Sequence, residues 1–104
     1  MAIKLSTGMQ LFDANLAAAA RGNAKAYFEL GVAFSTGTDG AEIDLVEAHK
    51  WFNLAALAGV REGSALRAEI AAEMDREDIA EAQRQARSWI AQMSAPPAAS
   101  RNAA

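Results

Sequence analysis

Few residues of this chain could do chemistry on a substrate or hold a metal ion. Its 104 residues include no cysteine and one histidine, His49. A metal site would have to join His49 to Glu42 or Asp44 without a second nitrogen ligand, and residues two apart on a helix do not face each other. We therefore expect His49 to be an exposed residue of a helix surface. We also expect no catalytic residue, no metal and no cofactor, so that the protein is not an enzyme.

Two other features could suggest a small-molecule site. Residues 37–40 read Gly-Thr-Asp-Gly, but they lack the lysine and the preceding strand of a phosphate-binding loop. Trp51, Phe52 and Trp89 could form a stacking platform for a cofactor. Because these aromatics occur at helical spacing among alanines, they are more typical of a protein core. Both features therefore favour structural roles: a turn for the glycines and a core for the aromatics.

The run from Arg21 to Gly59 has the spacing of two helices that pack closely. Gly31 lies inside a helical pattern, where glycine costs about 1 kcal/mol relative to alanine, so a close helix crossing is the natural compensation. Tyr27, Leu30 and Phe34 form one apolar face of the first helix. The second helix carries a matching stripe of small and aromatic residues, namely Ala48, Trp51, Phe52 and Ala55. The pattern predicts an antiparallel helix hairpin.

The same run resembles the Sel-one-like repeat family, a relative of the tetratricopeptide repeats. The resemblance rests on small, aromatic, acidic and glycine residues that recur together at Gly22, Ala26, Tyr27, Leu30, Gly31, Phe34, Gly37, Asp44, Glu47, Ala48, Trp51, Phe52, Ala55, Ala56 and Gly59. It covers the middle of the chain strongly and the last third loosely. It implies an all-α fold of short α-α hairpin repeats, a fragment of a solenoid, that serves as a protein-interaction module.

Helical periodicity and capping residues predict about five helices in one domain, residues 1–93. A capping box at Thr7 begins the first helix, and Asn23 and Asp44 cap the second and third. The predicted helices cover residues 8–21, 24–36, 44–58, 64–74 and 76–93, with a tolerance of about 2 to 4 residues at each end. Residues 94–104, a proline-containing stretch of small and polar residues, are predicted to form a disordered tail.

Composition and charge argue against several classes of partner. The formal net charge is −3 and the pI is about 5.0. A nucleic-acid footprint needs a basic patch, so we expect no nucleic-acid partner. The sequence has no uninterrupted apolar run of about 18 residues and no apolar segment of signal-peptide length. We therefore expect no membrane insertion and a cytoplasmic location.

A second stripe of the helix predicted over residues 24–36 points away from its hairpin partner. It consists of Lys25, Phe28, Val32 and Ser35. In the resembled family the first helix of each pair lines a concave surface, which implies that this stripe lines a binding groove. The same register adds Arg67, Ala71 and Met74 from the fourth predicted helix. We expect these residues to bind an extended or helical peptide with an apolar anchor and an acidic flank. Phe28 has an alternative place, packed beneath the first helix, and both places stay open.

Two functions follow from this organisation. The first is a non-catalytic adaptor, scaffold or regulator that binds a protein or peptide on its concave face. The second is a structural homo-oligomer or an accessory subunit of a larger assembly, because stacked repeats need about three units for stability and this chain holds one clear unit. In that case the groove, or the side carrying Leu54 and Leu57, would be buried permanently.

Overall fold

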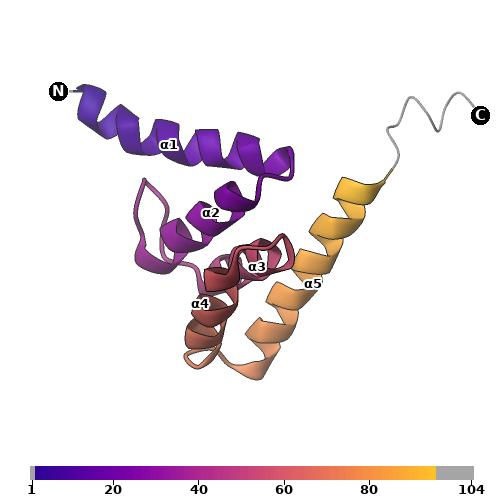
Figure 1. The fold of residues 1–104 in the computed structure, drawn as a ribbon. Coiled ribbons are helices and arrows are strands. Elements are labelled where there is room, and N and C mark those ends of the chain that lie inside the picture. Colours follow the sequence, from indigo (N-terminus) through magenta and orange to yellow (C-terminus); the bar gives the residue numbers. More distant parts are fainter. Residues whose placement is uncertain (1, 96–104) are drawn as a thin grey trace, which may run out of the picture.

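The computed structural model describes residues 2–95, with side chains from residue 8 onward, and these residues form helices without any strand. The helices are α1 (Ala2–Ala20), α2 (Ala24–Thr36), α3 (Leu45–Leu57), α4 (Arg61–Ala71) and α5 (Arg76–Ser94). In Figure 1, α1 runs over α2 at the top of the view, α3 and α4 lie together below, and α5 runs along the right side. The predicted all-α class with five helices is therefore correct for the described part of the chain.

Two helices differ from their predicted ranges by three or more residues at an end. The helix α1 begins at Ala2, so Thr7 lies inside the helix and the predicted capping box is wrong. Residues 2–5 include alanine, lysine and leucine, which are strong helix formers, and the helix continues through the capping motif. The helix α4 covers Arg61–Ala71 and so begins and ends three residues before the predicted 64–74. The predicted tail at 94–104 lies outside the described residues from position 96, and Ser94 is the last residue of α5.

Side-chain caps fix the beginnings of three helices. Asn23 Oδ1 accepts a hydrogen bond from the Ala26 amide at 2.9 Å, and Asp44 Oδ1 accepts one from the Glu47 amide at 3.2 Å. Each cap satisfies an amide that has no partner within its own helix. The predicted N-caps of α2 and α3 are thus confirmed. The helix α2 ends at Gly37, whose φ of 73° lies in the left-handed region that favours glycine.

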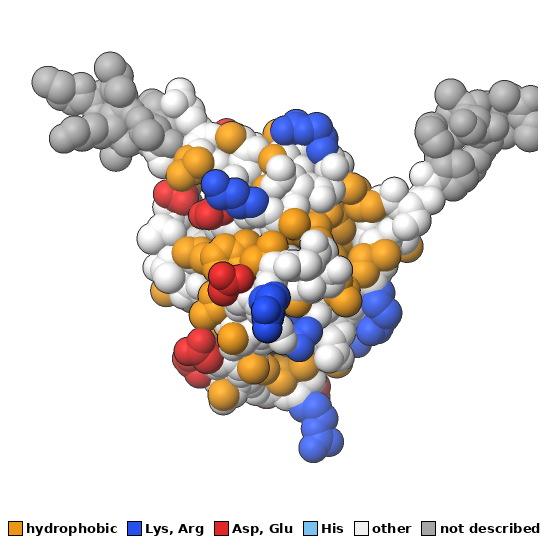
Figure 2. Space-filling view, in the orientation of Figure 1, with side chains coloured by type: hydrophobic (Ala, Val, Ile, Leu, Met, Phe, Trp, Pro, Cys, Tyr) orange, Lys and Arg blue, Asp and Glu red, His pale blue; other side chains and the backbone are white. Residues whose placement is uncertain are grey.

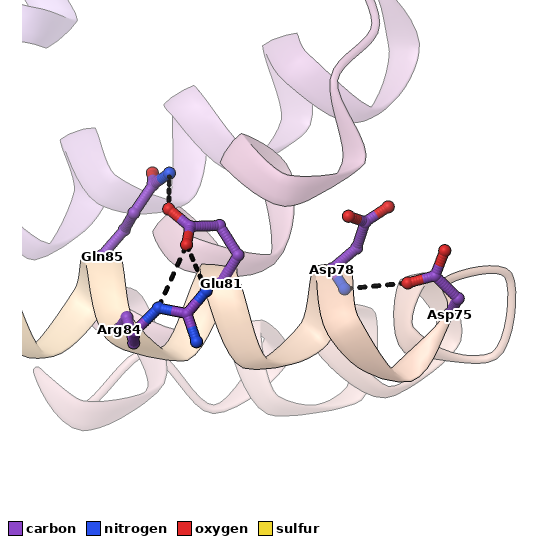
Figure 3. Close-up of polar contacts among 5 residues, drawn as sticks. All are labelled: Asp75, Asp78, Glu81, Arg84 and Gln85. Atoms are coloured by element: carbon purple, nitrogen blue, oxygen red, sulfur yellow. Dashed lines mark hydrogen bonds and ion pairs between the residues drawn. The ribbon is translucent and has the colours of Figure 1, made fainter.

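The exposed first half of α5 is held by local polar contacts (Figure 3). Asp75 Oδ1 accepts a hydrogen bond from the Asp78 amide at 2.8 Å and caps the helix. One turn later, Glu81 accepts hydrogen bonds from Gln85 at 2.9 Å and from Arg84 Nε at 3.1 Å. These hydrogen bonds, Gln85's above all, and then the positive charge of Arg84 lower the pKa of the Glu81 carboxyl. These contacts therefore stabilise α5 itself and do not join it to another helix.

The pair α2 and α3 crosses closely at Gly31, as the sequence predicts. A Cβ atom placed on Gly31 would lie 2.5 Å from Cδ1 and 2.6 Å from Cε1 of the Phe52 ring. A second close approach joins α3 to α4 at Gly63, where a Cβ atom would lie 2.7 Å from the Phe52 carbonyl oxygen and 3.0 Å from the Ala56 amide nitrogen. Glycine at both positions lets α2 and α4 approach the same stretch of α3 from two sides.

The helix α3 is the centre of the packing, because α2, α4 and α5 all lie against it. The helix α5 packs on α3 and makes few contacts with α4, so the last two helices do not form a hairpin like that of α2 and α3. An aromatic cluster of Tyr27, Trp51 and Trp89 joins three of these helices, with ring centroids 5.0 to 6.2 Å apart. Trp89 Nε1 donates a hydrogen bond to the Tyr27 hydroxyl at 3.1 Å, and Trp51 Nε1 donates one to Glu47 at 3.0 Å. The polar atoms of the cluster are thereby satisfied.

The predicted core role of the aromatics holds for this part of the structure. Trp51 is 3% exposed and Phe52 is 1% exposed, while Trp89 is half-buried against the same core. A second group of buried residues, Ala48, Phe52 and Ile70, fills the space between α3 and α4. Partly buried side chains from α2 and α4 pack around this second group, which forms the base of the candidate site.

Candidate partner-binding groove

A groove runs between α2 and α4 over the N-terminal half of α3. Its volume is about 490 Å³. It exists because α2 and α4 both pack on α3 and make few contacts with each other. The groove is lined by Val32, Ser35 and Thr36 from α2, Ile43 from the connecting loop, Leu45 and Phe52 from α3, and Leu66, Glu69, Ile70 and Glu73 from α4 and the turn after it. Figure 2 shows apolar side chains that reach the surface between α2 and α4.

The floor of the groove belongs to the buried core. Phe52 is 1% exposed, its ring lies against Gly31, and the centroid of the Phe28 ring is 5.6 Å from its own. Its own carbonyl group faces Gly63 across the α3–α4 crossing. Because neighbours on both helices hold this residue, the floor is already formed before any partner arrives.

The walls are mainly apolar. Leu66 and Ile70, four residues apart, form one row along α4, and Val32 faces the groove from α2. Ile43 lies at the loop end of the groove and is 65% exposed. The hydroxyl groups of Ser35 and Thr36 donate hydrogen bonds to the Val32 carbonyl at 3.0 and 2.7 Å, so their protons are used within α2. The groove is therefore an apolar surface that is open to solvent and can accept an apolar group.

The charged groups that line the groove are both acidic. Glu69 and Glu73 lie four residues apart at the end of α4 and in the turn that follows, and both are exposed. Among the described side chains neither carboxylate lies within ion-pair distance of a lysine or arginine, since the pairs that do form are Lys50 with Glu47 and Arg84 with Glu81. No basic side chain lines the groove in that part of the chain. The groove therefore has one negatively charged wall.

The residues predicted to bind a partner fall into three groups. Val32 and Ser35 line the groove. Phe28 and Met74 are half-buried and pack against the Phe52 group, so Phe28 contacts α3 and supports the floor. The remaining residues do not line the groove: Lys25 is exposed, and Arg67 and Ala71 are half-buried.

Arg67 is occupied by another contact. Its Nη1 atom donates a hydrogen bond to Asn53 Oδ1 at 2.5 Å, and Nη2 lies 3.5 Å from the Ser64 hydroxyl. The guanidinium therefore ties α4 to α3. Whether any of these predicted residues contacts a partner stays a prediction.

Sequence reasoning missed the α4 wall by one position. The predicted positions 67, 71 and 74 each follow a lining residue at 66, 70 and 73. One residue on an α-helix is about 100° of rotation, because 3.6 residues make a turn. The prediction therefore selected a neighbouring face of the same helix. The apolar pair at 66 and 70 was the available signal for the face that lines the groove.

The prediction for His49 is wrong, because this residue is buried and 3% exposed. The helix α3 is covered by α2, α4 and α5, so little of its surface stays in contact with water. Among the described residues, His49 Nδ1 has no hydrogen-bond partner. Burial, and secondly the positive charge of Arg67, lower the pKa of His49 below its usual value of 6.5. The imidazole is therefore neutral in the folded protein near pH 7.

A second, smaller hollow lies between the C-terminal halves of α3 and α5. Its volume is about 260 Å³, and it is lined by Tyr27, Leu54, Leu57, Ala58, Trp89, Ile90, Met93 and Ser94. Leu57 is 66% exposed, whereas Leu54 is 3% exposed and belongs to the core. The sequence analysis names the side that carries Leu54 and Leu57 as a surface that an assembly could bury. Of these two residues, only Leu57 has an accessible side chain.

Comparisons of the chain with protein-family models, with curated proteins and with solved structures find no match. Within residues 2–95, no helix has both the length and the apolar character that a membrane span requires. The side chains described from residue 8 onward include no group of three or more histidine, aspartate or glutamate residues placed to hold a metal ion.

Proposed function

We propose that this protein is a non-catalytic interaction module, an adaptor, scaffold or regulator, whose partner inserts apolar side chains into the groove between α2 and α4. The observation that carries the proposal is the open apolar groove over a preformed floor at Phe52. Its volume of about 490 Å³ falls in the range of about 300 to 1,000 Å³ that is usual for ligand pockets. A groove bordered by two helices suits a peptide segment of another protein.

The resemblance to Sel-one-like repeats supports the same surface. In that family the first helix of each pair lines the concave face, and we propose that α2 is such a helix in this chain, with α4 forming the opposite wall of the groove. We propose that the chain is related to these repeats through the hairpin of α2 and α3. The close packing of α2 on α3, with Gly31 at the crossing, supports this relationship.

The alternative function, a homo-oligomer or an accessory subunit, is favoured by one observation. Leu57, Ile90 and Met93 are 66%, 41% and 41% exposed around the smaller hollow. Apolar side chains that gather at a surface in this way favour burial against another chain. The two surfaces share no lining residue, so one experiment can separate the two functions.

The test uses a matched pair of substitutions, Ile43→Asp in the groove and Leu57→Asp in the smaller hollow. Ile43 and Leu57 are about equally exposed, at 65% and 66%, and each substitution adds one negative charge. Wild type and both variants are used as baits in an extract of the source cells, after circular dichroism has shown equal helicity. The size of each bait is measured by light scattering.

The groove function predicts a partner that wild type and Leu57→Asp retain and that Ile43→Asp loses. The captured partner is then produced alone and must bind the purified wild-type protein. A partner lost only with Leu57→Asp would assign binding to the smaller hollow. An oligomer that Leu57→Asp converts to a monomer, with no groove-dependent partner, would support the alternative function and contradict the groove.

A further inference from the structure

We propose that the groove selects a basic segment: a peptide of the partner with an apolar anchor and, beside it, lysine or arginine side chains that pair with Glu69 and Glu73. This inference rests on the proposed function and adds the chemistry of the partner. It reverses the acidic flank that the sequence suggests from Lys25 and Arg67. The reason is the place of the charges in the structure, which brings two carboxylates to the groove and leaves both basic residues outside it.

The apolar part of the partner is defined by the floor and the rows beside it. Leu66 and Ile70 on α4 and Val32 on α2 face a space closed below by Phe52. These side chains offer no charge and no hydrogen-bonding atom. The residue of the partner that enters here must therefore be apolar, since a buried polar group without a partner is costly.

The acidic wall defines the flank of the anchor. Glu69 and Glu73 lie next to Ile70, so a side chain that reaches these carboxylates starts beside the anchor. Both carboxylates are exposed and have no ion-pair partner among the described side chains. Glu69 lies in the last turn of α4 and Glu73 in the turn after it, so both carboxylates border the same end of the groove. The C-terminal end of α4 adds partial negative charge at the same place.

The charge complementarity favours a basic segment over an acidic one. An acidic flank would meet like charges at both positions, whereas lysine or arginine would gain two ion pairs at the rim. Arg67 does not line the groove, and its guanidinium donates a hydrogen bond to Asn53 on α3. The pairs at Glu69 and Glu73 are exposed, so they contribute mainly to selectivity and to the salt dependence of binding.

The test is a selection of random peptides displayed on phage against the full-length protein. Enriched peptides are synthesised, and their dissociation constants are measured by fluorescence anisotropy. The double variant Glu69→Gln, Glu73→Gln removes both charges of the wall and keeps the side-chain shapes. The double variant Asp13→Asn, Glu77→Gln makes the same change in net charge at exposed positions outside the groove. The variant Ile43→Asp tests whether a peptide uses the groove.

The expected peptides carry lysine or arginine next to an apolar residue. Ile43→Asp raises their dissociation constants at least tenfold, and the variant at Glu69 and Glu73 raises them about three- to tenfold. The control double variant leaves the dissociation constants unchanged. Raising the salt concentration from 50 to 500 mM weakens binding to wild type and has less effect on the Glu69 and Glu73 variant.

Other outcomes separate this inference from the proposed function. Peptides that depend on Ile43 but carry no basic residue, and that ignore the change at Glu69 and Glu73, overturn the inference and leave the groove function in place. Equal weakening by both charge variants shows a general effect of net charge and also overturns it. If no enriched peptide depends on Ile43, the groove function and the inference both fail.

Discussion

Replacing Gly31 by alanine tests the close crossing that holds the floor of the groove. The new Cβ atom would lie 2.5, 2.6 and 2.9 Å from three ring carbons of Phe52. Carbon atoms in contact are normally about 3.5 to 4.0 Å apart, so the methyl group would lie about 1 Å too close. The ring has little room to move away, because Phe52 is 1% exposed and the Phe28 ring packs on it. Either α2 moves outward or the core around Phe52 repacks.

The magnitude follows from two opposing effects. Adding a methyl group to a full core costs about 1 to 3 kcal/mol, and alanine regains about 1 kcal/mol of helix propensity relative to glycine. Because the overlap is with a buried ring, the cost should lie in the upper part of its range. We expect a net loss of about 1 to 2 kcal/mol in the free energy of unfolding, which lowers the Tm by roughly 4 to 16 °C for a domain of this size.

The assay is urea and thermal unfolding followed by far-ultraviolet circular dichroism, with Gly8→Ala as the matched control. Gly8 also lies inside a helix, but its Cβ would be 3.5 Å from Asp39 Cα, an ordinary contact. This control should gain about 0.5 to 1 kcal/mol. Adding Phe52→Leu to Gly31→Ala should cost less than the sum of the two single changes, because the smaller side chain relieves the overlap. A Tm of Gly31→Ala that is unchanged or raised would refute the close crossing.

Two further predictions concern α2 and α3. Asn23→Ala removes the side chain that caps α2 at the Ala26 amide and should destabilise the protein by about 1 kcal/mol in urea unfolding, with restoration by Asn23→Asp. For His49, the lowered pKa means that the unfolded chain takes up the proton first as the pH falls. The stabilising effect of the neutral imidazole should be complete above about pH 6.5 and should decline as the pH falls toward the lowered pKa of the folded state. His49→Leu should show a smaller loss of stability between pH 7.5 and 5.5 than wild type, and an equal loss would contradict this assignment.

Local sequence signals predicted the hairpin of α2 and α3 well. Asn23 and Asp44 act as caps, which depend on residues only three positions away. Gly31 inside a helix indicated the close crossing, because a glycine there needs a compensating contact. Gly63 carried the same signal for the crossing of α3 and α4 and was not used.

The remaining features depend on tertiary packing that no local pattern shows. His49 is buried because α4 and α5 both lie against α3, and the sequence gives no sign that the last helix packs there instead of on α4. The acidic wall was missed because its prediction depends on how α4 is rotated about its own axis. An error of one residue in that rotation moves a side chain by about 100° around the helix. No pattern in the sequence marks Glu69 and Glu73, and the structure shows that they border an apolar groove.

The capture experiment with Ile43→Asp and Leu57→Asp tests the central claim most directly. The two positions are equally exposed and the two changes are chemically matched, so general effects of charge and hydrophobicity cancel. If the groove between α2 and α4 is the binding site, wild type and Leu57→Asp hold the same partner and Ile43→Asp does not. Retention of every partner by a folded Ile43→Asp variant would contradict the claim.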